Sequence, residues 1–231
     1  MQDLMRDNHI YLSGGGNEKE SFPLDKFFFN TLLKNGRFLY IPVALRGNKL
    51  YKTTHLWMKG ILELHKRTDI QFEMADNLLK YRLEDLKNFD AVYIGGGNTW
   101  NLMQELRSSG FSNEIIQYIK NGGIVYGGSA GAIILGKNID THNDANKINL
   151  KDTSGFNLLS GYSVTCHYIN EQNNRFRDWS ISNNSPILCL PEETGLIFGD
   201  NSALCVGTKP CTIHFADGTK KEVQPEESFI L

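Results

Sequence analysis

One short segment constrains the fold of this chain more than any other. Residues 123–135 read GIVYGGSAGAIIL, so a strand-like apolar run leads through five small residues into a helix-like run. The five small residues, Gly127 to Gly131, form a G-x-S-x-G pattern between a strand and a helix, which is the context where this pattern indicates a nucleophile. Glycine on both sides lets the two elements approach across a sharp, strained turn. We therefore predict a nucleophile elbow with Ser129 at its apex; a plain tight turn is the alternative.

The same order of strand, glycine turn and helix recurs through the first two thirds of the chain. Strand-like runs occur at 9–12, 38–42, 70–74, 91–94 and 124–126, and helical patterns at 24–33, 55–66, 99–106 and 113–120. This alternation predicts an α/β fold with a mostly parallel central sheet. Residues 138–152 are polar and are expected to form a surface loop.

The last third of the sequence changes character. Strand-like pieces follow one another closely at 187–190, 196–198, 203–206, 212–215 and 228–231, separated by turn residues. We expect these pieces to add antiparallel strands to the parallel sheet. Because no linker rich in proline, glycine or serine divides the chain, residues 1–231 are predicted to form a single domain.

A second glycine loop follows the strand-like run at 91–94. Residues 91–100 read AVYIGGGNTW, and glycine there lets backbone N–H groups approach a ligand. The loop at the carboxyl end of a neighbouring parallel strand would lie beside Ser129. Gly97 N–H and Ala130 N–H are then candidates for an oxyanion hole. Asn98 is expected to cap the following helix, and it is also a candidate contact for the substrate.

Composition excludes several other classes of function. The formal net charge is −2 and the sequence pI is near 6.3, without the basic excess of a nucleic-acid-binding protein. No apolar run approaches the roughly 20 residues of a membrane span, and the first ten residues are too polar for a signal peptide. We therefore expect a cytoplasmic protein that binds no membrane. The four cysteines form no CxxC pair, so neither a metal, a disulfide nor another cofactor is expected.

Three segments in a fixed order resemble a known family. IGGGNTWNLM, GGSAGA and GFNLLSGYSVTCHY are similar to the aspartyl dipeptidase (peptidase E) and cyanophycinase family of serine peptidases. The resemblance extends from YLSGGG to LPEETGLIF, at about residue 200. It implies a flavodoxin-like three-layer fold, a Ser-His-Glu or Ser-His-Asp triad, and hydrolysis of short peptides or aspartate-rich material without a metal.

The resemblance assigns the triad position by position. The nucleophile falls on Ser129, the base on His167 and the acid on Glu192, with the neighbouring Glu193 left open. The oxyanion loop falls on Gly96 and Gly97. Chemistry supports this set, because a serine hydroxyl needs a base that titrates near neutral pH, and a carboxylate holds that histidine in one tautomer.

Substrate recognition is predicted after His167, where this family tends to carry arginines. Arg175 or Arg177 could bind a carboxylate of the substrate through two hydrogen bonds, although both could also be solvated surface residues. Arg46 and Lys49, in the loop after the strand at 38–42, are further candidates.

Together these features predict a serine exopeptidase of the dipeptidase E type. Its partner would be a short peptide such as a dipeptide with N-terminal aspartate, and the chain would act as a monomer or homodimer. One alternative is a non-catalytic module that binds a small acidic ligand. Another is an α/β-hydrolase esterase, whose triad order of serine, acid and histidine differs from the order found here.

Overall fold

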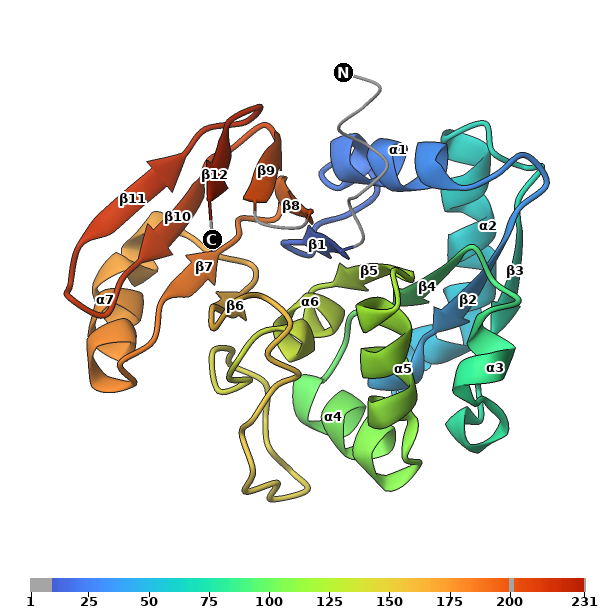
Figure 1. Cartoon of the computed structure of the whole chain (residues 1–231), viewed down its shortest axis with the longest axis horizontal. Coiled ribbons are helices and arrows are strands. Elements are labelled where there is room, and N and C mark those ends of the chain that lie inside the picture. The colour runs from blue at the N-terminus through green and yellow to red at the C-terminus, as the bar shows by residue number, and fades with distance from the viewer. Residues whose placement is uncertain (1–9, 200–201, 231) are drawn as a thin grey trace.

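A computed structural model describes residues 10–199 and 202–230 of the chain (Figure 1). Within them, eight strands form the main sheet in the order β12-β9-β8-β1-β5-β4-β2-β3. In chain order these strands are β1 (Ile10–Ser13), β2 (Arg37–Ile41), β3 (Gln71–Met74), β4 (Ala91–Ile94), β5 (Ile124–Gly128), β8 (Thr194–Phe198), β9 (Ser202–Gly207) and β12 (Ser228–Ile230).

The main sheet is parallel in one half and antiparallel in the other. Strands β1, β5, β4, β2 and β3 are parallel neighbours, whereas β8, β9 and β12 pair antiparallel. Taken from the edge strand β3, the parallel half of the sheet has the order β3-β2-β4-β5-β1. If β2 is counted as the first strand, β3, β2, β4 and β5 have the flavodoxin-like order 2-1-3-4, and β1 occupies the position of the fifth strand. The predicted α/β fold with a mostly parallel sheet and C-terminal antiparallel strands is thereby confirmed.

Helices cover both faces of this sheet. Residues alternate between the faces, so Phe38 and Tyr40 pack with helix-borne Phe28 while Leu39 and Ile41 enter the opposite core cluster. The first face carries α1 (Phe22–Thr31) and α2 (Thr54–Leu64), and the second carries α3 (Leu83–Leu86), α4 (Thr99–Ser108), α5 (Phe111–Lys120) and α6 (Ala130–Leu135). The result is a three-layer arrangement (Figure 1).

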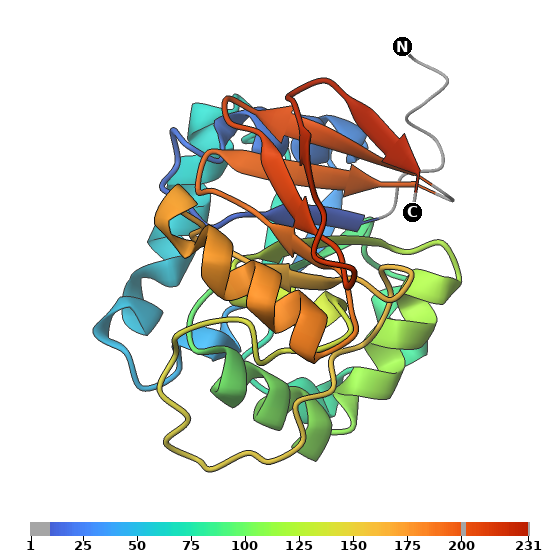
Figure 2. The same ribbon diagram turned by 90° about the vertical axis from the view of Figure 1, so that its left-hand side faces the viewer.

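A second, four-stranded sheet corrects one expectation from the sequence. The pieces at 187–190 and 212–215 were expected in the main sheet, but they form β7 (Ile187–Cys189) and β10 (Cys211–His214) of a separate sheet, with β6 (Ser163–Thr165) and β11 (Lys220–Val223) in the order β11-β10-β7-β6. Helix α7 (Asn173–Ser182) lies against this sheet (Figure 2). The prediction failed because strand partners far apart in sequence are not encoded in local alternation.

One hydrophobic cluster joins the two sheets. Leu12 and Val125 of the main sheet belong to the same buried cluster as Val164, Leu188 and Ile213 of the second sheet. The predicted loop at 138–152 is confirmed, since no helix or strand forms there. In the part of the chain that the structure describes, no helix is both long and apolar enough to cross a membrane.

Candidate active site

Ser129 lies between the last residue of β5 and the first residue of α6. Its backbone has φ 48° and ψ −106°, a strained conformation for a residue with a side chain. The Ser129 N–H donates to the carbonyl of Ser13 at 3.1 Å, which fixes the turn against β1. A Cβ on Gly131 would lie 2.3 Å from the Ile94 carbonyl oxygen, so only glycine permits this close crossing of α6 over β4.

Ser129, His167 and Glu192 form a continuous hydrogen-bonded chain. Ser129 Oγ lies 2.8 Å from His167 Nε2, and His167 Nδ1 lies 2.7 Å from Glu192 Oε1. The proton on Nδ1 then faces the carboxylate, which leaves Nε2 free to accept the serine proton. The side chains of His167 and Glu192 are 51% and 45% exposed, so a substrate can reach them.

The second sheet brings the histidine and the carboxylate together. Strands β6 and β7 are parallel neighbours, so His167 and Glu192, which follow them, emerge at the same sheet edge. The N–H of Tyr168 donates to the Leu190 carbonyl at 3.1 Å and continues this pairing. The N–H of His167 donates to the Gly14 carbonyl at 2.9 Å, which ties the edge to β1 of the main sheet.

Glu193, the residue next to Glu192, forms an ion pair with Lys209 instead of contacting His167. Glu193 Oε1 pairs with Lys209 Nζ at 2.7 Å, and this hydrogen bond lowers the pKa of Glu193. Glu192, rather than Glu193, therefore lies against His167.

Gly15 is a site residue that the sequence analysis left unassigned. Its φ is +98°, and a Cβ there would lie 2.7 Å from His167 Nε2 and 2.8 Å from the Cβ of Ser129. Gly15 belongs to the glycine run at 14–16 that follows β1, which we call the first glycine loop. The backbone of this loop therefore lies directly against the serine–histidine pair. The only signal in the sequence was the glycine run after the first strand.

The second glycine loop also reaches the serine. A Cβ on Gly96 would lie 3.3 Å from the Cβ of Ser129, and Gly97 has φ +139° with its backbone against the Ala44 carbonyl. Within residues 10–199 and 202–230, neither Gly97 N–H nor Ala130 N–H donates a hydrogen bond. Both are therefore available to an oxyanion.

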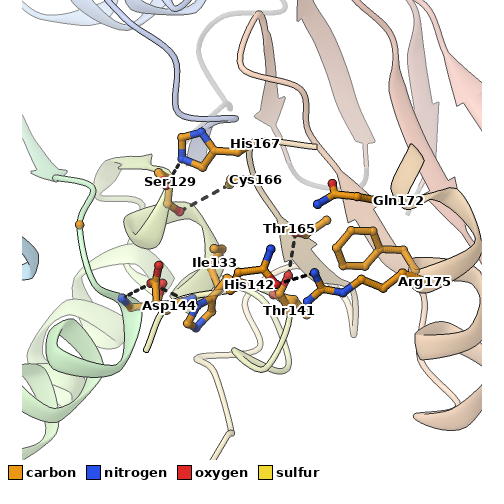
Figure 3. Close-up of a pocket in the computed structure, with 14 residues that line it drawn as sticks. Ser129, Ile133, Thr141, His142, Asp144, Thr165, Cys166, His167, Gln172 and Arg175 are labelled. Carbon is orange, nitrogen blue, oxygen red and sulfur yellow. Dashed lines mark hydrogen bonds and ion pairs between the residues drawn. The ribbon is translucent and has the colours of Figure 1, made fainter. Parts of the chain in front are cut away.

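Ser129 and His167 border two pockets. We call the first the charged pocket; its volume is about 280 Å³, and its polar lining includes His142, Asp144, Gln172 and Arg175. We call the second the apolar pocket; its volume is about 410 Å³ and its lining includes Tyr40, Leu45, Leu50, Trp57 and Tyr93. Figure 3 shows the charged pocket, with His167 above Ser129 and with Arg175 and Asp144 on opposite sides.

The charged pocket contains a cation without a carboxylate partner. Arg175 Nη1 donates to the neutral side chain of Asn143 at 2.6 Å, and among the described residues no carboxylate lies within 4.0 Å of the guanidinium. Its guanidinium also lies over the Phe176 ring, at 4.9 Å from the centroid. The positive charge of Arg175 is thus free to meet an anionic group of a ligand.

Asp144 supplies the opposite charge in the same pocket. Burial raises the pKa of this carboxyl, but hydrogen bonds with His142 and with the Thr99 N–H, at 2.7 Å from Oδ2, more than offset it and leave the pKa below its usual value. Asp144 is therefore ionised at neutral pH. Asp144 was not predicted as a site residue, because it lies in the polar segment 138–152 that was expected to be a surface loop.

Several predicted contacts lie elsewhere. Arg177 pairs with Asp178 at 2.9 Å, and Arg46 with Glu105 at 2.5 Å; neither lines the two pockets, and neither does Lys49. The Asn98 side chain accepts the Asn101 N–H at 2.9 Å and donates to the Ala145 carbonyl at 3.1 Å. The predicted helix cap is present, and Asn98 is not among the residues that line either pocket.

The four cysteines are buried free thiols. Cys166 lies behind Ser129, and its Sγ donates to the Ser129 carbonyl at 3.6 Å. Burial raises the pKa of this thiol, so it stays protonated. Among the described residues, no group of three or more histidine, cysteine, aspartate or glutamate side chains is placed to hold a metal ion.

Comparison with known proteins places this geometry in a family. Peptidase family S51 matches residues 10–206. Peptidase E of a Nostoc species is 29% identical over 171 residues, covering 69% of this chain and 70% of that protein. A protein of Drosophila melanogaster named "Probable alpha-aspartyl dipeptidase" is 24% identical over 203 residues, covering 81% and 79%.

The solved structures agree at the level of the fold. A peptidase from an acI-B1 Actinobacterium superposes with a TM-score of 0.70 at 19% identity, with all of both chains covered. The family match spans the serine turn, the histidine, the adjacent carboxylate and both glycine loops. This chain therefore belongs to peptidase family S51 and is a peptidase.

Proposed function

We propose that this peptidase is a serine exopeptidase that releases N-terminal aspartate from short peptides through an acyl-enzyme. The observation that supports it most directly is the continuous chain Ser129–His167–Glu192, with distances of 2.8 and 2.7 Å. Serine, imidazole and carboxylate in this order are the parts that nucleophilic acyl transfer requires.

The chemistry follows from the positions of the atoms. His167 Nε2 accepts the Ser129 proton while Oγ attacks the carbonyl carbon, and Glu192 stabilises the imidazolium through Nδ1. The N–H groups of Gly97 and Ala130 donate to the developing oxyanion. When the C–N bond breaks, the imidazolium protonates the leaving amine. A water molecule that loses its proton to His167 then attacks the acyl carbon and restores the serine.

The charged pocket supports aspartate at the N-terminus. An N-terminal aspartyl residue carries a side-chain carboxylate and an α-ammonium group. Arg175 offers a cation without a carboxylate partner to the first, and the ionised Asp144 offers an anion to the second. A site that binds the free amine accepts only the end of a chain, which is the reason for proposing an exopeptidase.

The test is a peptide panel of Asp-Ala, N-acetyl-Asp-Ala, Ala-Ala and Leu-Ala. We expect the wild type to prefer Asp-Ala, and Ser129→Ala to lower kcat by about 10⁴- to 10⁶-fold. Arg175→Ala should lower kcat/KM for Asp-Ala by about 10- to 100-fold, the scale of one charged hydrogen-bond pair. Arg177→Ala is the matched control on the same helix and should leave kcat/KM within about twofold.

Each part of the proposal has its own contrary outcome. Cleavage of Asp-Ala by a folded Ser129→Ala variant would contradict the serine mechanism. Equal rates on Asp-Ala and Leu-Ala would contradict the role of Arg175, and equal rates on the free and acetylated peptides would contradict the exopeptidase assignment. A folded wild type that cleaves nothing would favour the module that only binds a small acidic ligand.

A further inference from the structure

We propose that the apolar pocket binds the side chain of the leaving residue and makes the enzyme select large apolar or aromatic residues there. This inference rests on the proposed function, since it takes Ser129 as the nucleophile and the charged pocket as the site of the acyl residue. It adds the residues that decide specificity on the other side of the scissile bond, chiefly Leu50 and Trp57.

The position of the pocket supports this assignment. Gly97, Ser129 and His167 line both pockets, so the two meet at the atoms proposed to react. A peptide carbonyl held at Ser129 must extend in two directions, one toward its acyl residue and one toward its leaving amine. If the aspartyl residue lies in the charged pocket, the residue after the scissile bond enters the apolar pocket.

Aromatic rings form the wall of the apolar pocket. Tyr40 and Tyr93 meet edge to face, with ring centroids 5.5 Å apart. The Trp57 ring lies 6.4 Å from that of Tyr40 and 6.5 Å from that of Tyr93. Such a wall offers both ring faces and ring edges to an aliphatic or aromatic side chain.

Apolar surface at this pocket is exposed to water in the free protein. Leu50 is 60% exposed and Trp57 is 37% exposed, although both residue types are usually covered. They come from the neighbouring elements η3 (Lys49–Thr53) and α2. Because removing apolar surface from water is favourable, a large apolar side chain lying against them gains affinity that alanine cannot.

The lining also disfavours charged leaving residues. Of the described residues that line the apolar pocket, none is lysine, arginine, aspartate or glutamate. A charged side chain placed there would lose hydration without gaining an ion partner. The enzyme is thus expected to require a charged side chain on the acyl residue and to select against a charged side chain on the leaving residue.

The experiment compares kcat/KM for Asp-Phe, Asp-Leu, Asp-Ala and Asp-Lys. We expect the wild type to favour Asp-Phe over Asp-Ala by about 10- to 100-fold and Asp-Lys to be the poorest substrate. Trp57→Ala should lower the ratio of kcat/KM for Asp-Phe to that for Asp-Ala by about tenfold, and Leu50→Ala by about threefold.

Leu79→Ala is the matched control. Leu79 is also 60% exposed and lies in another 3-10 helix, η4 (Leu78–Lys80), but it lines neither pocket, so the substrate ratio should not change. Equal wild-type rates on all four peptides would overturn this inference alone, as would an equal loss on every substrate in the Leu50 and Trp57 variants. A folded wild type that cleaves none of them would overturn the proposed function and this inference with it.

Discussion

Both residues that would exchange the proton have an unusual backbone. Ser129 and His167 are non-glycine residues with φ of 48° and 54°. Such conformations cost about 1 to 3 kcal/mol each and persist only where surrounding contacts enforce them. Here the contacts come from one place, because the N–H of Ser129 binds the Ser13 carbonyl and that of His167 binds the Gly14 carbonyl. The end of β1 thus holds Ser129 and His167, the proposed nucleophile and base, in register.

Two adjacent glutamates give a sharp test of the third triad member. Glu192→Gln keeps the size of the side chain but removes the charge that stabilises the imidazolium, so we expect kcat to fall by at least about 10²-fold. Glu193→Gln removes only the surface pair with Lys209 and should leave kcat within about twofold. Steady-state kinetics with Asp-Ala, with circular dichroism to check the fold, would decide. Equal losses in the two variants would contradict the assignment of Glu192.

At the scale of elements, the candidate site lies where the carboxyl ends of strands from both sheets come together. Strands β1, β4 and β5 of the main sheet end in the glycine loops and the serine turn, while β6 and β7 of the second sheet end near His167 and Glu192. Parallel neighbours deliver their following residues to the same edge, as expected for open α/β sheets. The second sheet therefore carries His167 and Glu192, the proposed base and its carboxylate, to Ser129, the proposed nucleophile on the main sheet.

The first glycine loop should be intolerant of any side chain. Gly15→Ala places a Cβ within 2.8 Å of Ser129 and His167, so we expect kcat to fall by at least about 10²-fold as the pair separates. Gly122→Ala is the control, since φ is +86° there and a Cβ would meet nothing within 4 Å. Both variants should lose about 1 to 2 kcal/mol of stability from the positive φ, measured by urea unfolding. Wild-type activity in Gly15→Ala would contradict this prediction, because it would show that the loop can move aside without separating Ser129 from His167.

Local pattern accounts for much of this fold, but not for its long-range pairings. The strand predicted at 91–94 has the observed bounds, because four apolar residues before a glycine run suit a buried parallel strand. Strand β11 was missed, since three of its four residues are charged and exposed at a sheet edge. Asp144 was missed because its partner, the Thr99 N–H, lies 45 residues away. Nor could spacing show which of two adjacent glutamates faces His167, since that depends on Lys209.

At the scale of the whole molecule, the proposed catalysis would depend on how the two sheets are fixed to each other. The 2.8 Å contact between Ser129 and His167 joins residues carried by different sheets. The shared hydrophobic cluster and the backbone hydrogen bond from His167 to Gly14 help to hold the sheets together. Conditions that loosen the core should therefore separate the pair before the secondary structure is lost.

The stability of the core should itself depend on pH through one buried carboxyl group. Asp25, on α1, is only 2% exposed; it accepts hydrogen bonds from Tyr126 at 2.5 Å and from Ser21 at 2.7 Å. Among the described residues, the basic group within 4.0 Å of this carboxylate is His65, whose Nε2 lies 3.9 Å away and whose pKa is lowered by burial. Burial raises the pKa of Asp25 to about 6, from 3.8.

The sign of the effect follows from proton linkage. Between pH 4 and pH 6 the folded protein binds a proton at Asp25 that the unfolded chain does not, so the free energy of unfolding falls as pH rises through this window. Asp25→Asn keeps the shape and removes the charge. We expect wild type and variant to differ little in stability at pH 4, and the variant to be more stable by about 2 to 3 kcal/mol at pH 8. Urea unfolding at each pH would measure this, and a stability difference that does not change with pH would show that Asp25 titrates alike in the folded and unfolded chains.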